Sequence, residues 1–352
     1  MSATRPPKKL PKVARPASST IDLVGLGINS VDTILHVPHF PTFDSKLQIL
    51  SSEVLPGGQV ATAVVACQRW DLRTRYIGKI GDDSAGRTQR DEFNREGVDA
   101  HLIEVPHCAS QQAFILVDRS SGERTILWQR DPRLDLEPTE IAKEWITSAR
   151  LLHVDGHPTA PATQAARWAR EAGVIVTADI DNLYSGIKVL LEHVDYVIGS
   201  REFPQRITGM DNLAQALPEI ERRFGCRVTG ATLGRDGALL WDGQTFHYSR
   251  AFRVQTVDTT GAGDIFHAAF NYGLLQGWLL DRTLEFACAA AALNCTASGA
   301  RGGIKAIAEI ETLMSRGDRY AAAFLDGRVI ATSGPESSSR STGQLPEVKA
   351  RS

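Results

Sequence analysis

Short β-branched runs alternate with amphipathic helical windows from residue 21 to about residue 313, and this alternation restricts the chain to few folds. A strand followed by a helix, repeated along a chain, is typical of a sheet built largely from parallel βα units. The predicted strands are 21–27, 74–80, 149–155, 174–180, 196–200, 227–234, 237–243 and 252–258. The predicted helices are 61–70, 84–97, 159–173, 211–225, 262–277 and 280–298. We therefore expect one α/β domain over residues 21–315 with a central, mostly parallel sheet flanked by helices.

Two stretches break this alternation, 32–55 and 110–130. Both have the pattern of an antiparallel hairpin, and SSGE at 120–123 is the predicted turn of the second one. Together they predict a small separate sheet. Because a small sheet inserted into an α/β core commonly covers a ligand cleft, we interpret it as a lid. Its exposed edges favour pairing with a second copy of the chain, so we expect a homodimer formed through the lid.

The two ends of the chain differ from the domain in composition. Residues 1–20 are rich in Lys, Arg and Pro and contain no acidic residue, and residues 333–352 are rich in Ser, Gly and Pro. Neither segment has enough apolar side chains to pack, so both are predicted to be disordered tails. The basic tail would also suit a transit peptide or an arm that docks on an anionic surface.

Composition argues against several classes of protein. The net charge of −2 gives no electrostatic reason to expect nucleic acid as a partner. No run reaches the ~18 apolar residues of a membrane helix, and the N-terminus lacks the apolar core of a signal peptide. The five cysteines form no CxxC pair, which argues against a disulfide framework. These features predict a soluble protein of the reducing cytoplasm with no membrane partner.

The strongest chemical signal is DTTGAGD at 258–264, at the start of the predicted helix 262–277. Gly261 and Gly263 allow backbone conformations closed to other residues, and the helix start directs unpaired N–H groups at one spot. Such a spot binds phosphate. Asp264, in the first turn, can accept a proton from a hydroxyl that attacks this phosphate. On the residues alone, a plain helix entrance in which Asp264 stabilises the dipole is an equal alternative.

DTTGAGD followed by a helix of small residues resembles the C-terminal signature of the PfkB, or ribokinase-like, family of carbohydrate kinases. GGQVATAVVACQRW at 57–70 resembles the family's Gly-Gly signature, and VGLGINSVDTILHVPHFP at 24–41 resembles its first strand and following Asp. The resemblance extends over about residues 21–310. It implies a ribokinase-like three-layer α/β sandwich with a mostly parallel central sheet and a small β-sheet lid. Within the family, the framework looks closest to the sulfofructose-kinase-like branch.

The resemblance implies a kinase that uses ATP and Mg²⁺ to phosphorylate a hydroxyl of a monosaccharide or sugar derivative. It makes Asp264 the general base, and it makes the backbone of Gly261, Ala262 and Gly263 the anion hole for the transferring group. Loose phosphoryl transfer needs positioning and charge stabilisation more than covalent help. A base and oriented amides are therefore sufficient when Mg²⁺ is present.

On the acceptor side, the resemblance suggests that Asp32 accepts hydrogen bonds from two hydroxyls, and that the glycines let the backbone approach the ligand. Thr62 stands where many relatives have Asn. Arg130 and Lys46 are candidates to meet an anionic group of the acceptor, although lone basic side chains on hairpins are commonly solvated. The acceptor contacts are thus expected from Asp32, Gly57, Gly58, Thr62 and Lys46.

On the nucleotide side, the segment ATLGRDG resembles the family's strand and turn beside the ATP phosphates and ribose. This resemblance places Thr232 and Gly234 at the nucleotide. The segment NCTASGARGG, with Asn294 and Gly299, would form part of the loop beside the adenine.

Cation sites follow from the same resemblance. Asp258, Thr260 and Gly299 fall where relatives often hold a monovalent cation, which implies a K⁺ site. Relatives commonly organise the magnesium waters with an Asn-x-x-Glu stretch, but the corresponding segment here is SREF, which displaces Glu202 by one position. Because Mg²⁺ keeps most of its waters, Glu202 or Asp179 would suffice as an outer-shell carboxylate.

Three other functions stay open on the sequence. A nucleoside kinase or a non-catalytic nucleotide- or sugar-binding regulator would keep the same fold. GLGINS at 25–30 resembles an incomplete G-x-G-x-x-G and raises an NAD-dependent oxidoreductase, but its third glycine is missing and hairpin sequence follows it. ATP binding without turnover would favour the regulator, and an NADH response without ATP binding would favour the oxidoreductase.

Overall fold

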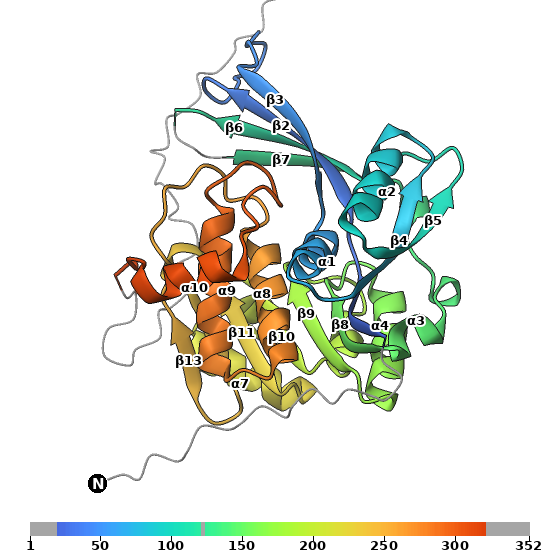
Figure 1. Cartoon of the computed structure of the whole chain (residues 1–352), viewed down its shortest axis with the longest axis vertical. Coiled ribbons are helices and arrows are strands. Elements are labelled where there is room, and N and C mark those ends of the chain that lie inside the picture. Colours follow the sequence, from blue (N-terminus) through green and yellow to red (C-terminus); the bar gives the residue numbers. More distant parts are fainter. Residues whose placement is uncertain (1–19, 121–123, 322–352) are drawn as a thin grey trace, which may run out of the picture.

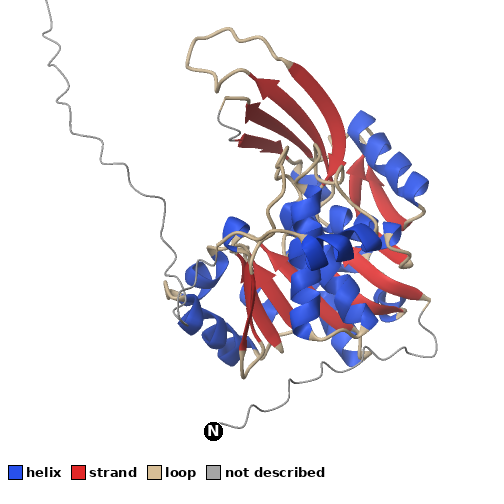
Figure 2. Ribbon diagram, turned by 60° about the vertical axis from the view of Figure 1, so that its left-hand side comes forward, coloured by secondary structure: helices blue, strands red, loops and turns tan. Residues whose placement is uncertain are grey.

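The structure is a computed structural model that describes residues 20–120 and 124–321. The predicted tails at 1–20, apart from Thr20, and at 333–352 lie outside the described residues, as does most of the predicted turn at 120–123. The described chain forms an α/β body, and a second, smaller sheet projects from one end of this body (Figures 1 and 2).

A nine-stranded sheet forms the centre of the body. Its strands are β1 (Ile21–Leu26), β4 (Thr74–Gly81), β5 (Asp99–Val105), β8 (Ala149–Val154), β9 (Ile175–Ile180), β10 (Tyr196–Gly199), β11 (Val228–Thr232), β12 (Ala238–Trp241) and β13 (Phe246–Ser249). Their order is β13-β12-β11-β10-β9-β8-β1-β4-β5. Only the pairs β11–β12 and β12–β13 are antiparallel. The expectation of a mostly parallel sheet is confirmed.

Helices cover both faces of this sheet. They are α1 (Gln59–Arg69), α2 (Ser84–Glu96), α3 (Lys143–Thr147), α4 (Thr159–Glu171), α5 (Ile187–Leu191), α6 (Phe203–Thr208), α7 (Leu213–Phe224), α8 (Ala262–Gln276), α9 (Leu280–Asn294) and α10 (Ile307–Arg316). Three short 3₁₀ turns are η1 (Pro132–Leu134), η2 (Pro138–Glu140) and η3 (Gly234–Asp236). Successive strand residues point to opposite faces, so Leu23 packs in the layer of α1, α8 and α9 and Val24 in the layer of α4 and α7. The three-layer arrangement is confirmed.

The small sheet consists of β2 (Ser30–Val37), β3 (Ser51–Gly57), β6 (Gln112–Asp118) and β7 (Arg124–Gln129), in the order β3-β2-β6-β7. The pairs β2–β3 and β6–β7 are antiparallel, as the hairpin patterns predicted, and β2 and β6 join the two hairpins in parallel. β2 begins shortly after the carboxyl end of β1. GLGINS therefore leads from one strand into another, without the helix that an NAD-binding fingerprint requires.

The strand predicted at 252–258 is wrong. Within it, only Phe252 forms a β-bridge, with Arg319, and residues 253–258 are irregular. The alternating apolar side chains that suggested a strand, Phe252 and Val254, instead line a cavity beside α9. The pattern did not predict β5, β13, α10 or the short helices α3, α5 and α6. β5 lies at the edge of the sheet and is largely half-exposed, so it lacks the continuous apolar run of a central strand.

Candidate active site

The start of α8 depends on a backbone conformation that glycine adopts easily. Gly261 caps the helix with a φ of 74°, and a side chain at this position would collide with Ala300. The first N–H groups of a helix lack helical partners and carry the positive end of the dipole. Ala262 and Gly263 line a cavity at this helix end, so the predicted anion hole faces open space.

Asp264 lies in the first turn of α8 and has a strongly altered acidity. Although part of the side chain reaches solvent, burial raises the pKa of Asp264 to about 8, and the carboxylates of Asp179 and Asp32 add to the shift. Arg301 acts in the opposite direction. This carboxyl group therefore keeps its proton to a higher pH than an ordinary Asp. A cation bound nearby would lower this pKa and favour the carboxylate.

We expect the Asp264→Asn variant to be more stable than the wild type at alkaline pH. The pKa in the folded chain lies above the ordinary value of 3.8, so the stability that this group contributes is lost as the pH rises through about 8. Asn does not ionise, so its burial adds no pH-dependent loss of stability. Thermal unfolding should show a gain of a few degrees at about pH 9 and little gain at about pH 4. The same difference at both pH values would contradict the raised pKa.

The predicted K⁺-site residues lie together in a hydrogen-bonded clasp between the loop before α8 and the loop after α9. The Asp258 carboxylate accepts hydrogen bonds from Thr260 N (2.9 Å), Thr260 Oγ1 (2.8 Å) and Gly299 N (2.9 Å). Asn294 Nδ2 donates to the carbonyl oxygens of Thr260 and Ala300, each at 3.1 Å. Asn294 is fully buried and does not line the cavity. The residue predicted beside the nucleotide therefore holds the two loops together instead.

Replacing Asn294 with Ala is expected to cost about 1–3 kcal/mol of stability for each buried backbone group left unpaired. Besides the two carbonyls, Gly303 N donates to Asn294 Oδ1 at 3.2 Å and loses its partner too. Urea unfolding measures the loss. Thr296→Ala is the matched control, because the Thr296 hydroxyl donates to the nearby carbonyl of Leu293 and to no other group in the described part of the chain. Equal stability of the Asn294→Ala and Thr296→Ala variants would contradict the clasp.

The predicted acceptor residues Asp32, Gly57 and Gly58 lie where β2 and β3 leave the body. Asp32 is buried, accepts a hydrogen bond from Ser30 Oγ at 2.8 Å, and has a pKa that burial raises. A side chain at Gly57 would collide with the Asp32 carboxylate, and one at Gly58, whose φ is 93°, would collide with Asn29. The two glycines thus make room for the protein itself, and not only for a ligand.

Thr62 lies beneath this loop rather than beside a ligand. It is fully buried, and its hydroxyl accepts a hydrogen bond from Arg301 Nε at 3.1 Å. The same guanidinium donates through Nη2 to the Gly57 carbonyl at 2.7 Å and forms an ion pair through Nη1 with Glu92 at 2.8 Å. Arg301 is therefore the support of the Gly57 loop. It was not among the predicted site residues.

The other charged candidates differ in how strongly they are engaged. Lys46 is exposed in the loop between β2 and β3. Arg130 donates to Gln111, to the Leu134 carbonyl and to Asp135, so its charge is already balanced within the protein. This network does not favour the expectation that Arg130 meets an anionic acceptor.

The magnesium candidates are also placed differently from each other. Glu202 is exposed at the N-terminus of α6. Asp179 forms a buried ion pair with His267 Nε2 at 3.1 Å, which lowers the pKa of Asp179 against the effect of burial. Within residues 20–120 and 124–321, no group of three or more His, Cys, Asp or Glu residues is arranged to hold a metal ion. Such a group is unnecessary for Mg²⁺, which keeps most of its waters and needs one or two carboxylates.

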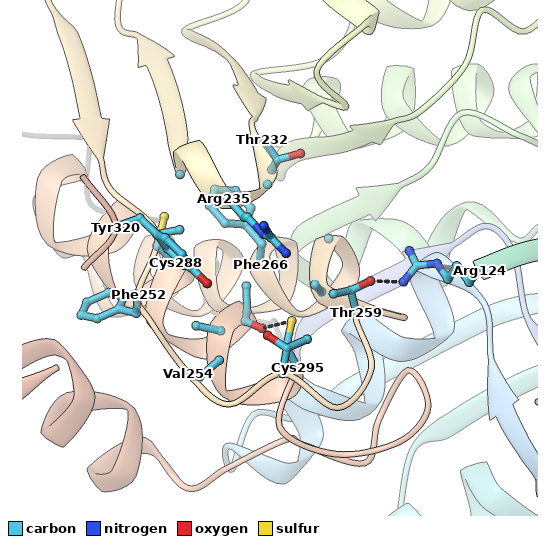
Figure 3. Close-up of a pocket in the computed structure, with 18 residues that line it drawn as sticks. Arg124, Thr232, Arg235, Phe252, Val254, Thr259, Phe266, Cys288, Cys295 and Tyr320 are labelled. Atoms are coloured by element: carbon cyan, nitrogen blue, oxygen red, sulfur yellow. Dashed lines mark hydrogen bonds between the residues drawn. The ribbon is translucent and has the colours of Figure 1, made fainter. Parts of the chain in front are cut away.

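A cavity of about 430 Å³ lies between η3, α8 and α9 (Figure 3). Its polar end includes Ala262 and Gly263 at the start of α8, and Thr232 and Gly234, the two residues expected at the nucleotide, also line the cavity. Much of the remaining wall is apolar, with aromatic rings at Phe252, Phe266 and Tyr320 and smaller groups at Val254, Cys288 and Ala291. An apolar slot that leads to a helix N-terminus suits a nucleotide, with the nucleobase at the apolar end and the phosphates at the helix N-terminus.

Two arginines that were not among the predicted site residues, Arg124 and Arg235, also line this cavity. Arg124 reaches the cavity from the small sheet, and its Nη1 hydrogen-bonds to Thr259 Oγ1 (Figure 3). Neither has a local sequence signal beyond its charge, and the contact between Arg124 and Thr259 spans 135 positions.

Comparison with known proteins agrees with this arrangement. A family model described as pfkB family carbohydrate kinase matches residues 21–307. Among curated proteins, a 5-dehydro-2-deoxygluconokinase of Geobacillus kaustophilus is 24% identical over 322 residues, covering 84% of this chain and 94% of the relative. A ribokinase of Haemophilus influenzae is 28% identical over 290 residues, covering 80% of this chain and 94% of the relative.

Solved structures give the same result for the fold. A putative ribokinase from Agrobacterium tumefaciens superimposes with a TM-score of 0.79 at 25% identity, covering 84% of this chain and 97% of that chain. An Arabidopsis thaliana ribokinase complexed with ribose and ATP superimposes with a TM-score of 0.71 at 21% identity, covering 84% and 99%. In the part of this chain that the structure describes, no helix is long and apolar enough to span a membrane. Since the family model matches most of its length, the chain belongs to the pfkB family of carbohydrate kinases.

Proposed function

We propose that this carbohydrate kinase transfers the γ-phosphoryl group of ATP to a hydroxyl of a monosaccharide or sugar derivative. The observation that carries the proposal is the position of Asp264. It follows directly after Ala262 and Gly263, which line the cavity, and its pKa responds to the charge of Asp32 on the small sheet. A nucleotide in the cavity and an acceptor at Asp32 would thus meet at Asp264.

In the proposed reaction, the acceptor hydroxyl gives its proton to Asp264 while its oxygen forms a bond to the γ-phosphorus. The bond between this phosphorus and the β–γ bridging oxygen breaks, and ADP leaves. The backbone N–H groups of 261–263 stabilise the negative charge on the transferring group. Mg²⁺ would neutralise phosphate charge, with Glu202 the proposed outer-shell carboxylate. We also retain K⁺ stimulation at the clasp of Asp258, Thr260 and Gly299 as a proposal.

Asp32 is the proposed recognition group for the sugar. Its carboxylate can accept hydrogen bonds from two hydroxyls, and the nearby Asn29 Nδ2 is buried without a hydrogen-bond partner among the described residues. A sugar hydroxyl could satisfy that donor. Relatives are named for ribose and for 5-dehydro-2-deoxygluconate, so both neutral and acidic sugars belong in a substrate screen.

The small sheet is the proposed dimer interface. Exposed apolar side chains lie on both of its edge strands, Val54 on β3 and Ile126, Leu127 and Trp128 on β7. Pairing with a second copy would cover them.

The five cysteines are free, which agrees with a proposed cytoplasmic location.

The experiment that tests the proposed function is a screen for ADP release from ATP and Mg²⁺ across ketoses, aldoses, their phosphate, sulfonate and carboxylate derivatives, and nucleosides. Release that depends on one sugar supports the proposal. Release with nucleosides alone would identify a nucleoside kinase. ATP binding without release with any compound would identify a non-catalytic regulator.

A further inference from the structure

Arg124 connects the small sheet to the loop that precedes α8. It is the first residue of β7, and its Nη1 hydrogen-bonds to Thr259 Oγ1 and lies 3.9 Å from Asp258 Oδ1. The side chain also lines the cavity that Ala262 and Gly263 line (Figure 3). An arginine of the small sheet thus stands at the phosphate end of the proposed nucleotide site.

The contacts that Arg124 makes with the described residues leave most of its hydrogen-bonding capacity unused. A guanidinium has five N–H donors, and the hydrogen bond described above uses one of its nitrogens. The carboxylate of Asp258 is already occupied by Thr260 and Gly299, and its distance of 3.9 Å from Arg124 is too long for a hydrogen bond. About one third of the Arg124 side chain remains exposed (34%). The group is therefore available to an anion.

The electrostatic surroundings favour a nucleotide phosphate as that anion. The carboxylate of Asp32 lies close enough to raise the pKa of Asp264, and the carboxylate of Asp258 lies close enough to raise that of Asp32. Of the residues that the structure describes, two cationic side chains, Arg124 and Arg235, and no acidic side chain line the cavity itself. Figure 3 shows the two arginines entering from different sides, Arg235 from η3 and Arg124 from the small sheet. Arg124 is the one that contacts the loop leading into α8.

We propose that Arg124 binds the terminal phosphates of the nucleotide, exchanging its contact with Thr259 for phosphate oxygens. The proposal rests on the proposed kinase function. Asp32 lies on β2 of the same sheet. The position of this sheet on the α/β body would therefore fix Asp32, at the sugar, and Arg124, at the phosphates, at the same time. A sugar bound at Asp32 should therefore strengthen ATP binding through Arg124.

The test measures the affinities of AMP, ADP and ATP for the full-length wild type and for Arg124→Met by calorimetry. If Arg124 makes a charge-assisted contact with the terminal phosphates, Arg124→Met should bind ATP about 10- to 100-fold more weakly than the wild type. Its affinity for AMP should be unchanged. Arg119→Met is the matched control. Arg119 lies on the same hairpin, is exposed, and its side chain makes no hydrogen bond or ion pair with the described residues. The Arg119→Met variant should bind AMP, ADP and ATP with the affinities of the wild type.

The Thr259→Val variant distinguishes phosphate binding by Arg124 from a purely structural role, because it removes the hydroxyl that Arg124 contacts. If Arg124 only fastens the sheet to the loop, Thr259→Val and Arg124→Met should show the same changes, and AMP and ATP should be affected alike. That result would overturn the proposal, as would an unchanged ATP affinity in Arg124→Met while the wild type turns over sugar. Retained AMP binding shows that the variants are folded. A wild type that binds no ATP and phosphorylates no acceptor would overturn the proposed function as well.

Discussion

Replacing Asp264 with Asn is expected to lower kcat by about 10²–10⁴, because the side chain can no longer accept the proton of the attacking hydroxyl. The start of α8 and the cavity do not depend on the charge of residue 264, so ATP affinity should stay within a few-fold of the wild type. Steady-state kinetics with the best acceptor and direct nucleotide binding measure the two effects.

The pH dependence distinguishes a base from a simple helix cap. Since the pKa of Asp264 in the free protein is raised to about 8, kcat/KM for the acceptor should fall about tenfold for each pH unit below that value. The residual activity of Asp264→Asn should lack this slope. A helix cap predicts instead a modest loss of stability and no loss of turnover. Asp281→Asn controls for that dipole effect, because it removes a first-turn carboxylate from the neighbouring helix α9 and keeps a side-chain oxygen for the contact with His247 Nδ1.

Replacing Arg301 with Met is expected to destabilise the protein by about 3–5 kcal/mol, because the buried Glu92 carboxylate loses its close partner at 2.8 Å and keeps only the largely exposed Arg95 at 3.5 Å. The side chains of Arg301 and Glu92 are almost fully buried, at 7% and 3% exposure. The variant also removes the donors to the Gly57 carbonyl and to Thr62 Oγ1. Urea unfolding at neutral pH measures the loss.

The double variant Arg301→Met, Glu92→Leu tests whether charge burial is the cause. It removes both ions, so it should recover part of the stability lost in Arg301→Met. The KM for the acceptor should be higher than that of the wild type in both the single and the double variant, since the Gly57 loop lacks the support of Arg301 in each. A loss below about 1 kcal/mol in the single variant would contradict the role assigned to Arg301.

Local patterns predicted those features whose cause is local. The two-sided burial of strands such as β1 and β8 needs near-continuous apolar runs, and these are visible in the sequence. The start of α8 is also local, because Gly261 must adopt a positive φ directly before the helix. The segment 252–258 had the same alternation as a strand but lies against a cavity, and no local pattern distinguishes the two.

Long-range contacts could not be predicted. Arg301 bonds to Gly57 across 244 positions, and Arg124 reaches Thr259 across 135. Such pairs depend on how the small sheet is seated on the body, which composition and periodicity do not encode. Resemblance assigned ligand contacts to Thr62 and Asn294, but both side chains are buried and hydrogen-bonded to the protein. The residue types fitted the family pattern, whereas their partners became visible only in the fold.

The most direct test of the central claim is to follow ADP release and phosphorylated sugar together in one reaction with wild type and with Asp264→Asn. We predict one phosphorylated sugar for each ADP in the wild type, and loss of both products in the variant while ATP binding persists. Near-normal turnover in Asp264→Asn would contradict the assignment of the base. ADP release without a phosphorylated acceptor in the wild type would contradict the assignment of a sugar kinase.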